Sequence, residues 1–239
     1  MCAHYKLRRG LNIPLTGKAD MITDPPVVSA LYALKPTDFK HIVPKLVVRE
    51  GDAVKAGSPV YCDKNRPEVR FTSPVSGTVQ SIVRGEKRRL EAIQILDDGK
   101  NEFLQFPAEA PETMSAQKIR ELLLESGCWP FIIRRPYGIT ALPGETPKAV
   151  FISCFDSAPL APDLDYAFAD REEALEMGLR VLERLCPRNI HLGLSDKTSP
   201  HSVFRRLQGI VHTFSGPHPA GNPGIQIHHV SPIGKDHVV

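Results

Sequence analysis

Two stretches decide the fold of the first part of the chain: KLVVREGDAVKAGSPVYCD at residues 45–63 and VRFTSPVSGTVQSIV at residues 69–83. Each predicts short strands joined by tight turns, at Gly51-Asp52, Ala56-Gly57 and Ser76-Gly77. A third stretch, RRLEAIQILDDG at residues 88–99, adds a strand that ends in a turn. VREGDAV and SPVSGTV therefore look like matching corners of two interlocked half-sheets.

This pattern resembles the barrel-sandwich hybrid of biotinyl/lipoyl domains, in which V-x-x-G-D-x-V-x-x-G precedes S-P-V-x-G-x-V. Such domains present a modified lysine on a tight hairpin, and Lys64 has nearly that setting. The segment NRPEVRFT (65–72) lengthens the hairpin, however, and the acidic-Lys-Ala or Met-Lys-Met context is missing. We expect an ordinary exposed lysine; the alternative is a lipoyl/biotinyl-type carrier modified at Lys64.

Composition excludes several classes of protein. The 239 residues are 41% hydrophobic and 24% charged, with no apolar run of the roughly 20 residues that span a bilayer and no signal-peptide h-region. The net charge of +3 gives no argument for nucleic acid, and RGEKRR (84–89) is expected to be a solvated hairpin tip. The five cysteines are widely spaced without C-x-x-C, so free thiols in a reducing cytoplasm are expected, without disulfides, zinc or iron–sulfur.

The proline-rich stretch FPAEAPETM (106–114) predicts a boundary between domains at residues 1–105 and 106–239. After it, helices and strands alternate, which predicts a parallel, Rossmann-like sheet. Ser115 is the expected N-cap of the first helix, and Asp170 with Glu173 an expected capping box. The predicted helices are 115–127, 170–187 and 198–209, and the predicted strands are 148–156, which should be buried, 189–194 and 210–214.

No residue pattern indicates a nucleotide, metal or nucleophile site. The stretch after VFISC (150–154) has no glycine and several acidic residues, where a dinucleotide fingerprint needs bare amides. If IQIHHV (225–230) is a strand, His228 and His229 point to opposite faces and cannot hold one ion. Cys154, in a buried strand, should be inert. We therefore expect no catalytic, cofactor-binding or metal-ligating residue.

Several segments together resemble the NqrA family, whose members are a subunit of the bacterial Na+-translocating NADH:quinone oxidoreductase. They occur in order over essentially the whole chain: KLRRGLNIPLTG, VREGDAVKAG, FTSPVSGTV, RGEKRRL, LLLESGCW, RRPYG, and GPHPAG followed by DHV. The family's proteins are roughly twice as long, so the resemblance implies an N-terminal half whose second domain is truncated at its C-terminal end.

The resemblance implies a peripheral, cofactor-free subunit on the cytoplasmic face of the inner membrane. The complex is a respiratory-chain translocase that passes electrons from NADH to quinone and exports sodium; FMN, FAD, iron–sulfur and NADH belong to partner subunits, and this fragment alone is not expected to be catalytic. The second half also looks like the FMN-binding subunit of complex I without its glycine-rich flavin loop. The remaining alternative is a flavin-dependent NADH dehydrogenase subunit.

The stretch CWPFIIRRPYG (128–138) is the predicted quinone contact. An apolar, aromatic wall with a few donors suits a ring with two carbonyls and an apolar tail. The residues proposed to contact quinone are Trp129, Phe131, Arg135, Pro136 and Tyr137. The family motif at Gly216, His218, Pro219 and Gly221 has no assigned role. The alternatives for the aromatic stretch are core packing with a surface arginine pair, or a contact for a membrane subunit.

Overall fold

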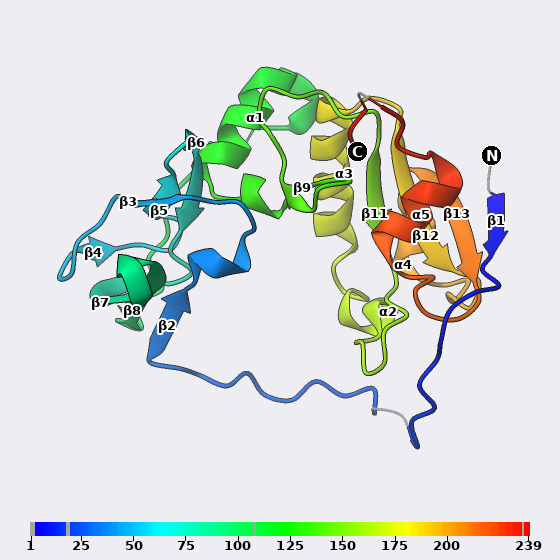
Figure 1. The fold of residues 1–239 in the computed structure, drawn as a ribbon, viewed down its shortest axis with the longest axis horizontal. Helices are drawn as coiled ribbons and strands as arrows, with labels where there is room; N and C mark the ends of the chain where they lie inside the picture. The colour runs from blue at the N-terminus through cyan, green and yellow to red at the C-terminus, as the bar shows by residue number, and fades with distance from the viewer. Residues whose placement is uncertain (1–2, 18–19, 108, 236) are drawn as a thin grey trace. The chain divides into compact units, whose positions relative to one another are not determined.

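The computed structural model describes residues 3–17, 20–107, 109–235 and 237–239. Two units interleave along the sequence (Figure 1). We call residues 1–24, 111–113 and 146–239 the α/β unit, and residues 25–110 and 114–145 the barrel unit. In the described part of the chain no helix is both long and apolar enough to cross a membrane.

The barrel unit contains two antiparallel sheets and a small hairpin. One sheet has the strand order β2-β8-β7-β4, the other β3-β5-β6, and β9 pairs with β10. The strands are β2 (Leu31–Leu34), β3 (Pro44–Leu46), β4 (Ala53–Val54), β5 (Pro59–Asp63), β6 (Arg66–Thr72), β7 (Gly77–Arg84), β8 (Leu90–Asp97), β9 (Ile133–Arg134) and β10 (Ile139–Thr140).

The two predicted corners interlock through backbone hydrogen bonds. The Gly51 amide donates to the Val79 carbonyl at 2.8 Å, and the Val79 amide donates to the Asp52 carbonyl at 2.9 Å. The Gly57 amide likewise donates to the Ser73 carbonyl at 2.8 Å. The predicted strands and turns of this region are confirmed, and their buried apolar residues form the core: Val54, Val60, Tyr61, Val69, Phe71, Val79, Ile93 and Ile95.

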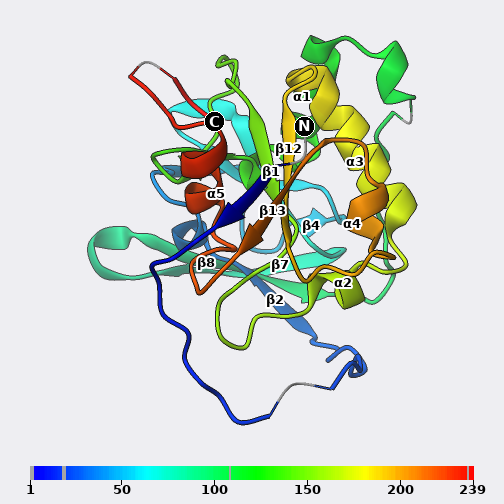
Figure 2. The same cartoon turned by 90° about the vertical axis from the view of Figure 1, so that its right-hand side faces the viewer.

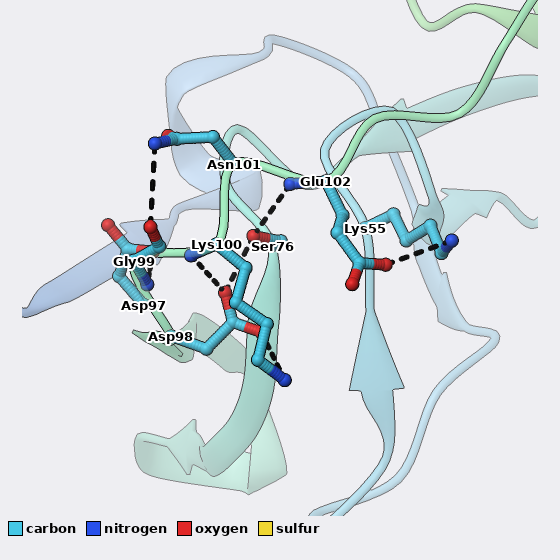
Figure 3. A network of polar contacts seen from close by, with 8 residues as sticks. All are labelled: Lys55, Ser76, Asp97, Asp98, Gly99, Lys100, Asn101 and Glu102. Carbon is cyan, nitrogen blue, oxygen red and sulfur yellow. Dashed lines mark hydrogen bonds and ion pairs between the residues drawn. The ribbon is translucent and has the colours of Figure 1, made fainter.

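A polar network closes the Ser76 corner against the loop that follows β8 (Figure 3). The buried Ser76 hydroxyl donates to the Asp98 carboxylate at 2.7 Å and accepts from the Glu102 amide at 3.1 Å. The Lys100 amide also donates to Asp98, at 3.0 Å. These bonds hold the pKa of Asp98 below its usual range, the Ser76 bond being the largest cause.

Lys64 and Asn65 form the turn between β5 and β6, and both side chains are exposed. The turn is held by the buried Asp63 carboxylate, which accepts from the Asn65 amide and from the Arg66 guanidinium at 3.2 and 2.7 Å. The RGEKRR segment is an exposed tip between β7 and β8 that includes the 3-10 turn η2 (Glu86–Arg88). The expected exposure of both tips is confirmed.

The α/β unit is built on a four-stranded sheet of order β1-β13-β12-β11 with all neighbours parallel, as predicted. Its strands are β1 (Ala3–Lys6), β11 (Val150–Ser153), β12 (Ile190–Ser195) and β13 (Ile210–Ser215). The predicted burial of the strand at 148–156 is wrong for β11 itself, whose residues are half-buried because β11 is an edge strand among those described; Ala149 and Cys154 on either side of it are buried. β1, from the extreme N-terminal part of the chain, was not predicted in this sheet.

Helices cover both faces of this sheet (Figure 2). Leu192 and Leu194 of β12 pack with residues of α3 (Glu172–Leu185) and α4 (Val203–Arg206). On the other face, Phe214 of β13 packs with residues of α5 (Pro223–Val230). A further short helix, α2, covers Leu164–Ala167. This is a three-layer α/β arrangement.

Three expectations about the helices of this unit need correction, one of them for a segment that was considered as a strand. Residues 225–230 are not a strand: the Asn222 side chain accepts from the Gly224 amide and Pro223 occupies the first turn, so the segment begins a helix. The expected capping box at Asp170 does not form, since Arg171 is the N-cap of α3 and makes no side-chain cap bond. α4 is only four residues long and begins after the Ser202 cap, not at Pro200.

The two compact units of the structure do not separate at residue 105. The predicted first helix is confirmed as α1 (Ala116–Glu125), capped by Ser115, but it packs on β6 of the barrel unit. The segment with β9 and β10 also belongs to the barrel unit, whereas β1 belongs to the α/β unit. The boundary between residues 105 and 106 stays a prediction about domain organisation.

Candidate functional site

Trp129 belongs to the core of the barrel unit. It begins the 3-10 turn η4 (Trp129–Phe131), and only 5% of its surface is exposed. Its indole Nε1 donates to the Ala141 carbonyl at 2.8 Å, so the polar atom of the ring is satisfied. Trp129 thus fixes the hairpin that carries the other predicted contacts, and its ring is not open to a ligand.

The arginine pair divides into two roles. The Arg134 guanidinium donates twice to the Glu145 carboxylate, at 2.5 and 2.6 Å, and lies 4.4 Å from the centre of the Tyr137 ring. These contacts raise the pKa of Arg134, with the Glu145 hydrogen bonds the largest cause. Arg135 precedes a cis peptide bond to Pro136 and is half-buried. Within the described residues its side chain makes no hydrogen bond or ion pair, so it is available to a ligand.

Phe131 points into an aromatic cluster that the sequence did not predict. Its ring lies 5.9 Å from that of Phe39, which packs edge-on to Phe71 at 4.7 Å. Phe71 in turn stacks on Tyr61 at 4.4 Å, with an angle of 5° between the planes. Phe131 is 73% exposed, so the cluster opens to solvent at this ring.

These four rings border a cavity of about 200 Å³, which we call the aromatic cavity. Its polar groups include Lys35, which precedes η1 (Pro36–Asp38), Asp38 within η1, and Thr72 at the end of β6. Burial raises the pKa of the Tyr61 hydroxyl, and the charge of Asp38 raises it further. Tyr61 therefore stays a neutral donor beside the cavity at physiological pH.

The structure brings together only part of the predicted quinone contact. Phe131 lines the aromatic cavity, whereas the rings of Trp129, Phe131 and Tyr137 make no ring contact with one another within the described residues. Sequence reasoning missed Phe39 and Tyr61. The one available signal was the aromatic character of inward positions in β5 and β6, which does not tell which distant loop would cover them.

The family-motif loop at residues 216–221 closes the carboxyl end of the α/β sheet. The His218 amide donates to the Asn12 side chain at 2.9 Å, and the Leu11 amide donates to the His218 carbonyl at 3.0 Å. The His218 ring Nδ1 is 3.0 Å from the Ser157 hydroxyl, which also accepts from the Gly221 amide at 2.8 Å. The loop thus joins the N-terminal segment to the loop after β11.

Gly221 lies directly on the backbone that follows β11. A Cβ at this position would lie 2.5 Å from the Ser157 amide nitrogen, so only glycine fits there. In parallel α/β sheets a nucleotide phosphate meets amides just after the carboxyl end of a strand. Here the Ser157 amide is covered by the motif loop.

The cysteine and histidine residues give no metal site within the part of the chain described. No group of three or more metal-ligating side chains lies together there. Cys154 is buried just after β11, and burial raises the pKa of its thiol to about 12, as expected for an inert cysteine. His228 and His229 follow each other on α5, with ring centres 5.4 Å apart.

Comparison with known proteins identifies relatives of both parts. A family model described as the NqrA N-terminal barrel-sandwich hybrid domain matches residues 5–98, and one described as the NqrA second alpha/beta domain matches residues 114–239. These descriptions confirm the predicted fold classes.

Curated relatives are named as the A subunit of a Na(+)-translocating NADH-quinone reductase. The protein of Pseudomonas aeruginosa is 36% identical over 232 residues, which is 96% of this chain and 51% of that protein. That of Neisseria meningitidis is 36% identical over 238 residues, covering 98% of this chain and 53% of the relative. The chain spans about half the length of the curated relatives it matches.

Proposed function

Because the chain belongs to the NqrA family, we propose that it forms the N-terminal part of the NqrA subunit of a Na+-translocating NADH-quinone reductase. Two family models that follow each other along the chain support this proposal. The other subunits of the complex are its partners, and it lies at the cytoplasmic face of the bacterial inner membrane. The names of the relatives do not favour a carrier modified on Lys64 or a flavin-dependent dehydrogenase subunit.

This part of the subunit binds no flavin, and FMN, FAD, iron–sulfur and NADH are held by partner subunits. The geometry after β11 supports this part of the proposal. The Ser157 amide is covered by Gly221, and Asp156 and Asp163 add negative charge in the loop where a phosphate would approach. The Asp156 and Asp163 carboxylates instead accept from the Ala158 and Tyr166 amides, at 2.8 and 3.2 Å.

The aromatic cavity is the quinone contact of this part of the protein. Quinone rings pack well against aromatic faces, and Phe39 and Phe131 present such faces beside a cavity open to solvent. The Lys35 ammonium donates to one carbonyl and stabilises the negative charge that develops on reduction. Trp129 holds Phe131 in place, and Arg135, Pro136 and Tyr137 follow on the same hairpin, where they contact the tail.

The lone tryptophan allows a direct binding test. A short-tailed ubiquinone is titrated into the 239-residue chain, and Trp129 fluorescence is followed with a free tryptophan derivative as the control for absorption by quinone. We expect saturable quenching that weakens by about tenfold in Phe131→Ala, since one aromatic contact and its buried area are lost. Lys35→Ala should weaken binding to a smaller extent.

Tyr137→Ala is the matched control for the ring contact: it removes an exposed aromatic ring of the same hairpin that does not line the cavity, and the short tail of the probe makes its proposed tail contact small. It should change the affinity far less than Phe131→Ala. Quenching that is linear in quinone, or equal in the parent and Phe131→Ala proteins, would count against the aromatic cavity. The same substitutions in the assembled complex should raise the KM for quinone, and an unchanged KM would place the working site elsewhere.

A further inference from the structure

A second cavity of the barrel unit, which we call the basic cavity, has a different chemistry. It has a volume of about 360 Å³ and lies among the loop after η1, Pro44 and the start of β8. Lys40, His41 and Arg89 line it together with the Thr37 hydroxyl. Apart from Phe39, which borders both cavities, its residues are not those of the aromatic cavity.

The cations of the basic cavity are not neutralised by the fold. The side chains of Lys40, His41 and Arg89 are exposed, and among the described residues none of them makes an ion pair or a side-chain hydrogen bond. Three exposed donors without a partner around one cavity give it a positive local potential, which attracts an anion.

The hairpin tip of RGEKRR extends this charge. The tip contains Arg84, Lys87 and Arg88, next to Arg89. The Arg84 guanidinium donates to the Arg88 carbonyl at 3.2 Å, which leaves its charge without an acidic partner among the described residues. The acidic residues of the same segments are Asp38, Glu86 and Glu91, against five Lys and Arg residues besides His41. With histidine counted as neutral, these segments carry two of the surplus positive charges of a chain whose net charge is +3.

The backbone at this place is also unusual. His41, Lys87 and Arg88 have φ values of +61°, +53° and +59°, in the left-handed region that side chains other than glycine seldom adopt. Residues held in such conformations cluster at ligand sites, because the surrounding structure must maintain them. Two of the three belong to the tip and one to the cavity wall.

We propose that the basic cavity binds a phosphate group. Arginine presents a planar fork of donors that matches phosphate oxygens, and lysine adds a point charge. The Thr37 hydroxyl and the His41 ring supply further donors to the same anion. A phospholipid headgroup and a free phosphate ester share this chemistry, and the half-buried Ile42 and exposed Val43 beside the cavity favour a phosphate that carries an acyl chain.

Two probes test the site on the 239-residue chain. Inorganic phosphate is titrated by calorimetry, and cosedimentation is measured with phosphatidylcholine vesicles that contain phosphatidylglycerol and with vesicles of phosphatidylcholine alone. We expect binding to the anionic vesicles that decreases as salt is raised. The double variant Lys40→Ala/Arg89→Ala should weaken it by about fivefold or more, and Arg89→Lys, which keeps the charge but loses the fork of donors, should weaken it less.

Lys100→Ala, compared with Arg89→Ala alone, is the matched control, because each removes one exposed cation of the barrel unit. Lys100 lies beyond the end of β8, and Arg89 immediately precedes its start; a strand of that length separates them by about 25 Å. Binding to anionic vesicles alone identifies a lipid headgroup, and binding to free phosphate as well identifies a general phosphate site. The proposal fails if neither probe binds, or if Lys100→Ala weakens binding as much as Arg89→Ala. Quinone quenching should be unchanged in the double variant, so the two proposals succeed or fail separately.

Discussion

At the scale of single residues, the ion pair of Arg134 with Glu145 is better shielded from solvent than that of Lys118 with Glu109. Its side chains are 16% and 34% exposed, and two hydrogen bonds join them in a fork arrangement. Lys118 with Glu109 forms an equally short pair, but its side chains are 48% and 44% exposed. Solvent screens the second pair far more than the first.

We therefore expect Glu145→Gln to lower the free energy of unfolding by about 1 kcal/mol, a value reduced from that of a fully buried charged hydrogen bond because Glu145 is partly exposed. Glu109→Gln, the control, should lower it by about 0.5 kcal/mol or less. Urea unfolding followed by Trp129 fluorescence measures both. Equal effects of the two variants would show that the fork geometry adds nothing.

At the scale of elements, the end of α1 is fixed by its contact with β6. Gly127 follows the helix with φ of +75°, the left-handed conformation that glycine favours after a helix. A Cβ at Gly127 would also lie 2.4 Å from the Thr72 hydroxyl oxygen, at the end of β6. The left-handed conformation follows from local sequence, whereas the close approach depends on tertiary packing.

Gly127→Ala should accordingly destabilise the protein by about 2 kcal/mol or more, since backbone strain and overpacking add. Gly99→Ala separates the two causes, because Gly99 has a similar φ of +68° and no atom within 4 Å of the added Cβ. Its cost should be about 1 kcal/mol. Thermal unfolding of both variants measures the difference, and equal shifts in Tm would remove the packing argument.

At the scale of the whole molecule, the two units respond to acid in different pH ranges. In the α/β unit, Nδ1 of His191 lies 2.9 Å from Nε2 of His212. Burial lowers the pKa of each histidine below 6.5. The unfolded chain takes up these protons first, so stability falls as pH drops through 6.5. In the barrel unit the pKa of Asp98 is lowered from 3.8, so the stability that the Asp98 carboxylate adds to the fold is present above pH 3.8 and is lost below it.

Between about pH 7.5 and pH 5.5 we thus expect the β12 amides to lose protection from hydrogen exchange, after correction for intrinsic rates. Urea unfolding followed by Trp129, in the barrel unit, should change little over that range. His212→Asn should reduce the loss at β12, and His201→Asn, at an exposed histidine, should not. Parallel losses in both units, or no effect of His212→Asn, would contradict the assignment to the buried pair.

Local sequence determined the elements whose cause is local. The corners at Gly51 and Ser76, the Ser115 cap and the apolar runs of β12 and β13 depend on near neighbours, and those predictions are confirmed. The strand considered for residues 225–230 does not form, because the apolar residues there fit a helix as well as a strand. There the Asn222 cap and Pro223 in the first turn decide for a helix.

Tertiary structure alone decided what distant segments form together. Phe39 packs against both Phe71 and Phe131. Arg89 and Lys40 line the same cavity, because strand pairing brings residues far apart in sequence to one place. No pattern within a window of sequence encodes those distances. The repeat of VREGDAV and SPVSGTV determined the scaffold by itself, since turns and alternation are properties of neighbouring residues. Both cavities depend on packing across the unit, because their walls come from separate elements.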